Sequence, residues 1–127
     1  MMNESHHSAP WAASARAKYF QIASQAEAGR AAYRAVNDRF AAVVQTLSRA
    51  ESRLREIEKQ IATGKAEDFV IARLPAAQAE VANIRETLAQ LQAQAAEIEQ
   101  ASRLPMRLAN EGRKLLRDLN ILRIDEA

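Results

Sequence analysis

Several residue types that catalytic sites and covalent frameworks depend on are missing or scarce in this sequence. None of the 127 residues is cysteine, which excludes disulfides, a thiol nucleophile and a cysteine-ligated zinc cluster. Glycine and proline occur three times each, so the chain has few places to turn. Aromatic residues make up 5%, and much of the 48% apolar content is alanine, which buries little surface per residue.

Long hydrophobic runs are also absent. No stretch approaches the roughly 18 consecutive apolar residues of a membrane span. Residues 1–10 lack a basic region followed by an apolar core, so they do not form a secretory signal. We therefore expect no membrane partner, no secretion by a signal peptide, and a location in the cytoplasm or within a macromolecular assembly.

What the sequence does contain is a repeat of apolar and small residues that steps by alternating threes and fours. An average spacing of 3.5 residues places such residues along one side of a helix, which a second helix must cover. The sequence thus predicts an all-α fold, a long antiparallel coiled-coil helical hairpin. We call these residues the seam. Its first run is Ala15, Tyr19, Ile22, Ala26, Gly29, Tyr33, Val36, Phe40, Val43, Leu47, Ala50, Leu54, Ile57 and Ile61, and its second is Val70, Leu74, Ala77, Val81, Ile84, Leu88, Leu91, Ala95 and Ile98.

The glycine and proline residues that interrupt the repeat predict where the helices begin and end. We expect a flexible leader over residues 1–10 and a single hairpin domain over residues 11–119. Its first helix covers 14–62, and its turn covers 63–66 around Gly64, because glycine suits the left-handed position just past a helix end. The return helix covers 67–102, with a kink at Pro75. A short strand at residues 69–71 is the competing interpretation, although no second strand lies nearby to pair with it.

The repeat changes phase near Pro105, which predicts a short third helix over residues 105–119. Its apolar side would hold Leu108, Gly112, Leu115, Leu119 and Leu122. Residues 120–127 form a tail that is flexible or bound to a partner. The tail could also continue the helix or add a strand to the edge of a partner's sheet.

Charged residues beside the seam test the antiparallel register. Folding at Gly64 pairs positions whose numbers sum to about 131. Arg53 then faces Glu80, and Glu51 faces Arg85, so both pairs join opposite charges. Each pair would add only a few tenths of a kcal/mol, and their value is in the register they indicate. A parallel homodimer, with Arg53 near Glu58 of a second copy, is the alternative.

No set of residues predicts catalysis. His6 and His7 are the only histidines and lack a third metal ligand. Gly64-Lys65 lacks the other residues of a phosphate-binding loop, and the carboxylates follow the polar faces of helices. We expect no enzyme activity, no cofactor, no metal and no small-molecule substrate.

Surface residues carry the functional prediction. Alanines away from the seam form a second stripe in the first helix, which is either an exposed helix-forming surface or a contact surface for self-association or a protein partner. We therefore predict a non-enzymatic assembly or adaptor protein, an oligomeric subunit of a larger complex such as a viral particle. The candidate partner surface consists of Trp11, Tyr19, Phe20, Ala28, Ala31 and Ala35.

Charge distribution favours a second hypothesis. Residues 11–55 carry eight bases and three acids, and residues 103–127 carry six bases and four acids, whereas residues 56–102 have a net charge of −4. A hairpin brings the two basic segments together. Grouped cations of this kind neutralise phosphates, so the alternative is a nucleic-acid-handling or genome-packaging protein, and an acidic protein partner would fit the same charges. The predicted basic patch consists of Arg16, Lys18, Arg30, Arg34, Arg113, Lys114 and Arg117.

Overall fold

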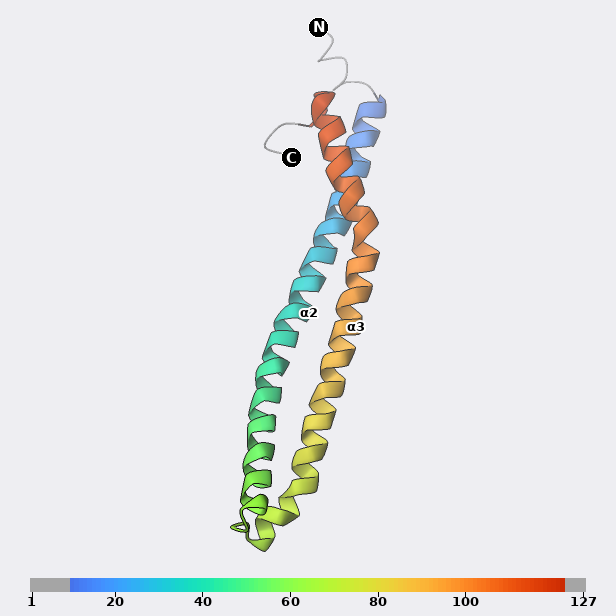
Figure 1. Cartoon of the computed structure of the whole chain (residues 1–127). Coiled ribbons are helices and arrows are strands. Elements are labelled where there is room, and N and C mark those ends of the chain that lie inside the picture. Colours follow the sequence, from blue (N-terminus) through green and yellow to red (C-terminus); the bar gives the residue numbers. More distant parts are fainter. Residues whose placement is uncertain (1–9, 123–127) are drawn as a thin grey trace. The chain divides into compact units, whose positions relative to one another are not determined.

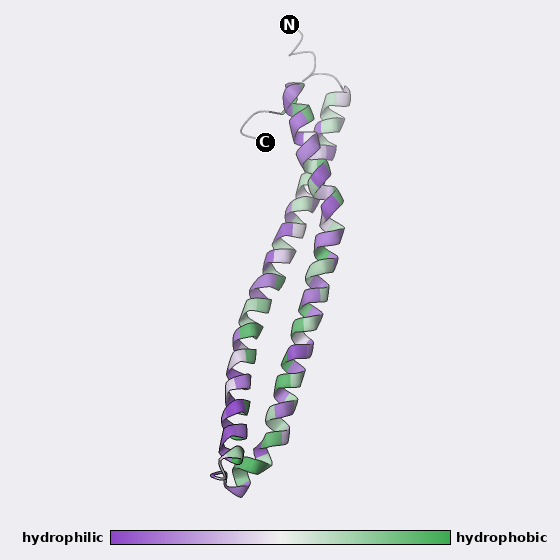
Figure 2. Cartoon of the chain, viewed as in Figure 1, coloured by the Kyte–Doolittle hydropathy of each residue, from purple (hydrophilic) through white to green (hydrophobic). Residues whose placement is uncertain are grey.

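Two helices make up the fold. A computed structural model describes residues 10–122, in which helix α2 (Pro10–Ala62) is followed by helix α3 (Asp68–Asp118) and no strand occurs. The helices form a helical hairpin (Figure 1), so the predicted all-α hairpin is confirmed. Hydrophobic and hydrophilic residues are interleaved along both helices (Figure 2). Within residues 10–122, neither helix has a stretch long and apolar enough to cross a membrane.

Helix α2 begins and ends at recognisable signals. Its first residue is Pro10, four residues before the predicted start, and proline suits this position because its missing N–H has no helical partner there anyway. At the other end, the amide of Lys65 donates to the carbonyl of Gln60 and the amide of Gly64 donates to Ile61. This is the Schellman arrangement, with Gly64 in the left-handed region at φ 70°.

Helix α3 begins directly after the turn. The carbonyl of Glu67 accepts from the amides of Val70 and Ile71, and Asp68 places a negative charge in the first turn, where the helix dipole favours it. Residues 69–71 are helical, so the alternative of a strand at this place is wrong.

The predicted third helix does not exist as a separate element. Helix α3 runs without a break from Asp68 to Asp118 and includes both Pro75 and Pro105. A proline inside a helix costs about 3 kcal/mol, in part because the carbonyl four residues earlier loses its partner. Here those carbonyls belong to Ile71 and Ala101, both exposed residues that water can reach. The helix continues because packing on both sides of each proline outweighs this cost.

The end of α3 is capped by a residue that the sequence analysis assigned to the tail. Asn120 has a φ of 59°. The amide of Ile121 donates to the carbonyl of Leu116, and the amide of Asn120 donates to Arg117, which is a second Schellman arrangement with asparagine in place of glycine. Ile121 and Leu122 are thereby turned back into the core. Residues 120–122 are therefore not a flexible tail, and the rest of that prediction lies outside the described residues, as does most of the predicted leader.

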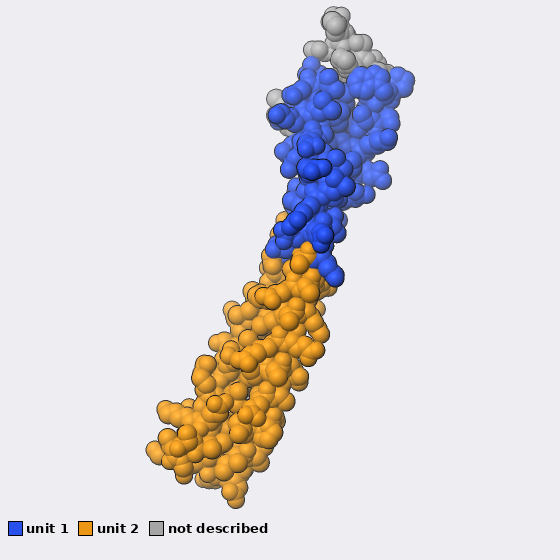
Figure 3. All heavy atoms as spheres, turned by 45° about the vertical axis from the view of Figure 1, so that its right-hand side comes forward, with its two compact units in different colours: residues 1–33, 97–127 blue, residues 34–96 orange. Residues whose placement is uncertain are grey.

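The hairpin divides into two compact units (Figure 3). Unit 1 contains residues 1–33 and 97–127, and unit 2 contains residues 34–96. Unit 2 includes the turn. Unit 1 brings together the first part of α2 and the last part of α3.

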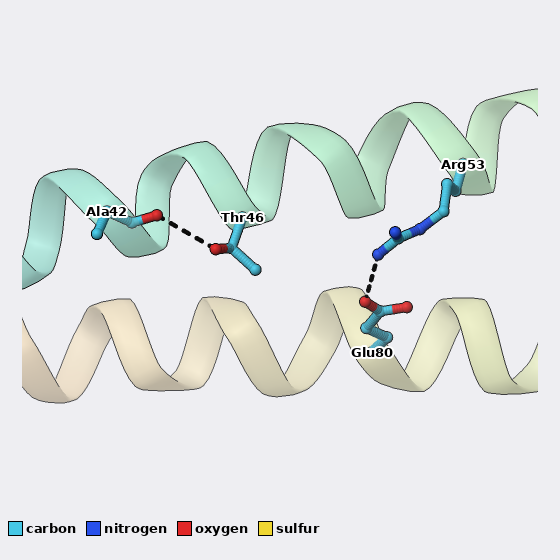
Figure 4. Close-up of polar contacts among 4 residues, drawn as sticks. All are labelled: Ala42, Thr46, Arg53 and Glu80. Carbon is cyan, nitrogen blue, oxygen red and sulfur yellow. Dashed lines mark hydrogen bonds and ion pairs between the residues drawn. The ribbon is translucent and has the colours of Figure 1, made fainter.

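In unit 2 few seam residues are fully buried. Only Ala50, Val81 and Leu91 are buried there, and the other seam residues are half-buried. Arg53 donates to Glu80 at 2.6 Å (Figure 4), and Arg85 donates to Glu51 at 3.2 Å. Both predicted ion pairs are therefore present, and they confirm the antiparallel register. Thr46 bonds to the carbonyl of Ala42 in its own helix (Figure 4), so it makes no contribution to helix pairing.

In unit 1 the helices approach each other closely at small residues. A Cβ atom built on Gly29 would lie 2.9 Å from the Cβ of Ser102, and closer still to its Oγ, while one built on Gly112 would lie 3.5 Å from the ring of Tyr19. Each of these pairs has the same numerical sum that the turn at Gly64 predicts, so the register holds in this unit as well. Ala12, Tyr19, Leu116, Ile121 and Leu122 form the core cluster.

The predicted apolar side after Ile98 is wrong at Leu108 and Leu115 and right at Gly112, Leu119 and Leu122. The seam runs through Ser102, Pro105, Ala109, Gly112, Leu116 and Leu119, which continue the alternation of fours and threes without interruption. Leu108 and Leu115, which the sequence analysis placed inside, are exposed. The close contact between Gly29 and Ser102 fixes Ser102 in the seam, and the 3-4 spacing counted from Ser102 then places Ala109 and Leu116 inside instead of Leu108 and Leu115.

Candidate interaction surfaces

The register defines two flanks of the hairpin. In an antiparallel pair, residues that directly precede a seam residue lie on one side, and residues that directly follow one lie on the other. Unit 2 shows this directly, since Arg53 and Glu80 both precede seam residues and pair, whereas Glu51 and Arg85 both follow seam residues and pair. The same rule sorts the surface residues of unit 1 into two groups with different chemistry.

The side that precedes the seam in unit 1 carries exposed leucines among polar and charged residues. We call it the leucine flank. Its apolar residues include Trp11 and Ala28 on α2 with Leu104, Leu108 and Leu115 on α3, and its charged residues are Lys18, Glu97, Glu111 and Asp118. The three leucines are 55%, 39% and 59% exposed. They are spaced by four and seven residues, so they form one row along α3. Large aliphatic side chains in such a row are typical of a surface that a further helix covers.

The side that follows the seam in unit 1 is rich in arginine. We call it the arginine flank, and it comprises Arg16, Phe20 and Arg30 on α2 with Arg103, Arg113 and Arg117 on α3. Arg16, Arg30 and Arg113 are half-buried, since their aliphatic stems lie against the helix pair while their charged ends reach water. The Arg16 guanidinium lies 5.4 Å from the centroid of the Phe20 ring, within the range of a cation–π contact.

Two of these arginines have acidic neighbours. Arg30 pairs with Glu27 at 3.1 Å, and Arg103 pairs with Glu99 at 3.6 Å. Within residues 10–122, neither Arg113 nor Arg117 has a carboxylate within ion-pair distance. Positive charge on the arginine flank is therefore greatest near the end of α3.

The residues of the predicted partner surface lie in several different parts of the structure. Tyr19 is buried in the core cluster, with its ring centroid 5.1 Å from that of Phe20. Phe20 is 41% exposed on the arginine flank, and Trp11 and Ala28 are exposed on the leucine flank. Ala31 is exposed away from both flanks, while Ala35 is exposed in unit 2.

The predicted basic patch is also divided. Arg16, Arg30, Arg113 and Arg117 share the arginine flank, whereas Lys18 lies on the leucine flank. Lys114, two residues before seam residue Leu116, points outward from the helix pair, and Arg34 belongs to unit 2. Four of the seven residues are thus brought to one side. This grouping was not predicted from the sequence, although each of the four directly follows a seam residue.

An open hollow lies beside the turn in unit 2. It has a volume of about 600 Å³ and is lined by the Arg53–Glu80 pair, by Phe69 and by Arg73. The Arg73 guanidinium lies 5.4 Å from the centroid of the exposed Phe69 ring. The residues that line this hollow include no histidine, serine or threonine.

No cluster of potential metal ligands occurs in the part of the chain that the structure describes. There, no three histidine, aspartate or glutamate side chains come together as a metal site would need. His6 and His7 lie outside the described residues.

Comparison with known proteins gives no relative for this chain. No protein-family model, curated protein or solved structure matches it. The two flanks of unit 1 are therefore the basis for any functional assignment.

Proposed function

We propose that this protein is a non-enzymatic helical assembly subunit, and that it associates with a second copy of itself through the leucine flank. The observation that carries the proposal is the exposed row of Leu104, Leu108 and Leu115 on α3. Complete burial of a fully exposed leucine side chain is worth about 1.5–3 kcal/mol, and these three are about half exposed, so covering each one contributes about half of that value. The row therefore favours association of the hairpins.

Charges beside the row favour a second copy as the partner. Arg107 and Glu111 form an ion pair at 3.9 Å within α3, and Glu111 lies in the row between Leu108 and Leu115. In a two-fold arrangement with antiparallel α3 helices, Leu104 of each copy faces Leu115 of the other. Arg107 of each copy then comes near Glu111 of the other, so the surface is self-complementary, as an isologous interface requires.

Several finer features belong to the same proposal. They are coiled-coil packing of the seam, a kink at Pro75, and a place in the cytoplasm or inside a larger assembly as a structural or adaptor subunit. The 3-4 spacing of the seam supports coiled-coil packing, and the lost hydrogen bond at Pro75 supports the kink.

Sedimentation of the full-length chain over a range of concentrations tests this function. We expect the wild type to form a defined oligomer and the double variant Leu108→Gln, Leu115→Gln to be monomeric with unchanged helicity, because both side chains are exposed in the single chain. The matched control is Phe69→Gln with Ile71→Gln, which removes two exposed apolar residues from unit 2 and should leave the oligomer intact. A monomeric wild type at all concentrations, or equal dissociation of both variants, would contradict the proposal.

A further inference from the structure

The arginine flank of unit 1 has a charge composition unlike that of the opposite flank. Over residues 10–33 and 97–122, positions that directly follow a seam residue hold five arginines and two glutamates, a net charge of +3. Positions that directly precede one hold one lysine and three acids, a net charge of −2. The two sides of the same helix pair therefore attract different partners.

The register places three arginines at one level of the arginine flank. The register that pairs Gly29 with Ser102 and Tyr19 with Gly112 places Arg16 opposite residue 115, midway between Arg113 and Arg117. On α3, Arg113 and Arg117 are four residues apart and so are neighbours on the helix surface. The three cations thus come from both helices and form one cluster.

Within residues 10–122, no carboxylate lies within ion-pair distance of Arg113 or Arg117. Glu27 and Glu99 are engaged with Arg30 and Arg103, toward the other end of the flank. Glu111 and Asp118 each directly precede a seam residue, so they lie on the leucine flank. The cluster is therefore a region of concentrated positive charge beside an exposed aromatic ring, that of Phe20.

We propose that Arg16, Arg113 and Arg117 bind the phosphates of a single-stranded nucleic acid, and that Phe20 stacks on one of its bases. Guanidinium groups match phosphate oxygens in a two-pronged geometry. A cationic surface that follows the backbone, combined with an aromatic side chain that stacks on a base, is the usual means of binding single strands. An acidic protein segment would use the arginines but would have no use for the ring, so the presence of Phe20 favours nucleic acid.

The test measures binding of a fluorescent single-stranded oligonucleotide of about 15 nucleotides to the full-length protein by anisotropy, over a series of salt concentrations. For the double variant Arg113→Gln, Arg117→Gln we expect affinity to fall about tenfold or more at low salt. The slope of log affinity against log salt should decrease by about 1.4, since each phosphate contact contributes about 0.7. The variant Phe20→Leu should weaken binding by about fivefold or more while the slope stays unchanged.

A charge-matched control separates the cluster from general electrostatics. Arg39→Gln with Arg55→Gln removes two exposed arginines from unit 2 and should change affinity by less than about twofold. Equal weakening by both double variants would overturn the proposal, as would the absence of binding by the wild type. Tighter binding of a polyglutamate peptide than of the oligonucleotide, with no effect of Phe20→Leu, would also overturn it and assign the cluster to an acidic protein. Because the leucine flank is untouched, sedimentation of the same variants shows whether assembly is independent of this site.

Discussion

The two units use the same 3-4 spacing but pack in different ways. In unit 2 most seam residues are half-buried, and ion pairs on both flanks mark the register. In unit 1 small residues such as Gly29, Ala26 and Ser102 lie in the seam, and a cluster of larger residues closes the end. Several side chains of the arginine flank become half-buried there, whereas the leucine flank stays exposed. The comparison shows that one spacing pattern can give two flanks of unequal exposure, as it does in unit 1.

The largest expected effect comes from the core cluster of unit 1. Ile121 is 1% exposed, and Ile121→Ala should lower the free energy of unfolding by about 2–4 kcal/mol, because it leaves a cavity beside Leu116. Hydrogen exchange measured by mass spectrometry should show faster exchange in residues 10–33 and 97–122 and a much smaller change in residues 34–96.

The same substitution in unit 2 provides the control for this difference. Ile71 is 46% exposed, so Ile71→Ala should change stability by less than about 0.5 kcal/mol. If Ile121→Ala were as mild as Ile71→Ala, the turn at Asn120 would not hold Ile121 in the core, and the contrast between the units would be lost.

Two glycines of unit 1 should respond in opposite directions to the same change. Gly29→Ala forces a methyl group against Ser102 and should destabilise the protein by about 1–3 kcal/mol despite the better helix propensity of alanine. Gly112→Ala meets the Tyr19 ring at an ordinary contact distance and should stabilise by up to about 1 kcal/mol. Thermal unfolding of the two variants checks the pair, and stabilisation by Gly29→Ala would show that the helices are not in close contact there.

The smallest expected effect concerns the ion pairs of unit 2. A double-mutant cycle with Arg53→Ala and Glu80→Ala should give a coupling free energy of about 0.2–1 kcal/mol, since both side chains are well exposed. The coupling should decrease as salt is added. A coupling that is large and insensitive to salt would mean that this pair is shielded from water and that unit 2 is more tightly closed than its exposed flanks indicate.

Much of this fold follows from spacing alone. The alternation of threes and fours predicts both helices, Gly64 predicts the turn, and the position of Gly64 then predicts the register. Arg53 and Glu80 are paired because that register places them together. These features depend on backbone geometry, which the sequence pattern expresses directly.

The errors arise where hydrophobicity and spacing disagree. Leu108 is more hydrophobic than Ala109, which favoured Leu108 as the inside residue, and the same phase then placed Leu115 inside. The structure follows the uninterrupted spacing instead and buries Ala109 and Leu116. Asn120 could have indicated the end of α3, because asparagine tolerates the left-handed conformation, but the burial of Ile121 also needs Ala12 and Tyr19 of α2 in the same cluster, which only tertiary packing supplies.

The arginine flank could have been recognised from the same spacing. Arg16, Arg30 and Arg113 each directly follow a residue of the predicted apolar side, so their grouping could be read from the sequence. Arg117 joins them only when the seam runs through Leu116, so the error after Ile98 hid this fourth arginine. The phase of the 3-4 spacing along α3 determines which side chains lie on the same side of the hairpin. The functional hypothesis depends on that grouping.

The constant register restricts how this hairpin can change in length. Each seam residue has a partner whose number is determined by its distance from Gly64, so an insertion in one helix misaligns every pair beyond it. An insertion of seven residues in α2 keeps the seam on one side, but it also requires seven residues at the matching level of α3. Insertions and deletions in this protein should therefore be tolerated only as paired heptads, one in each helix.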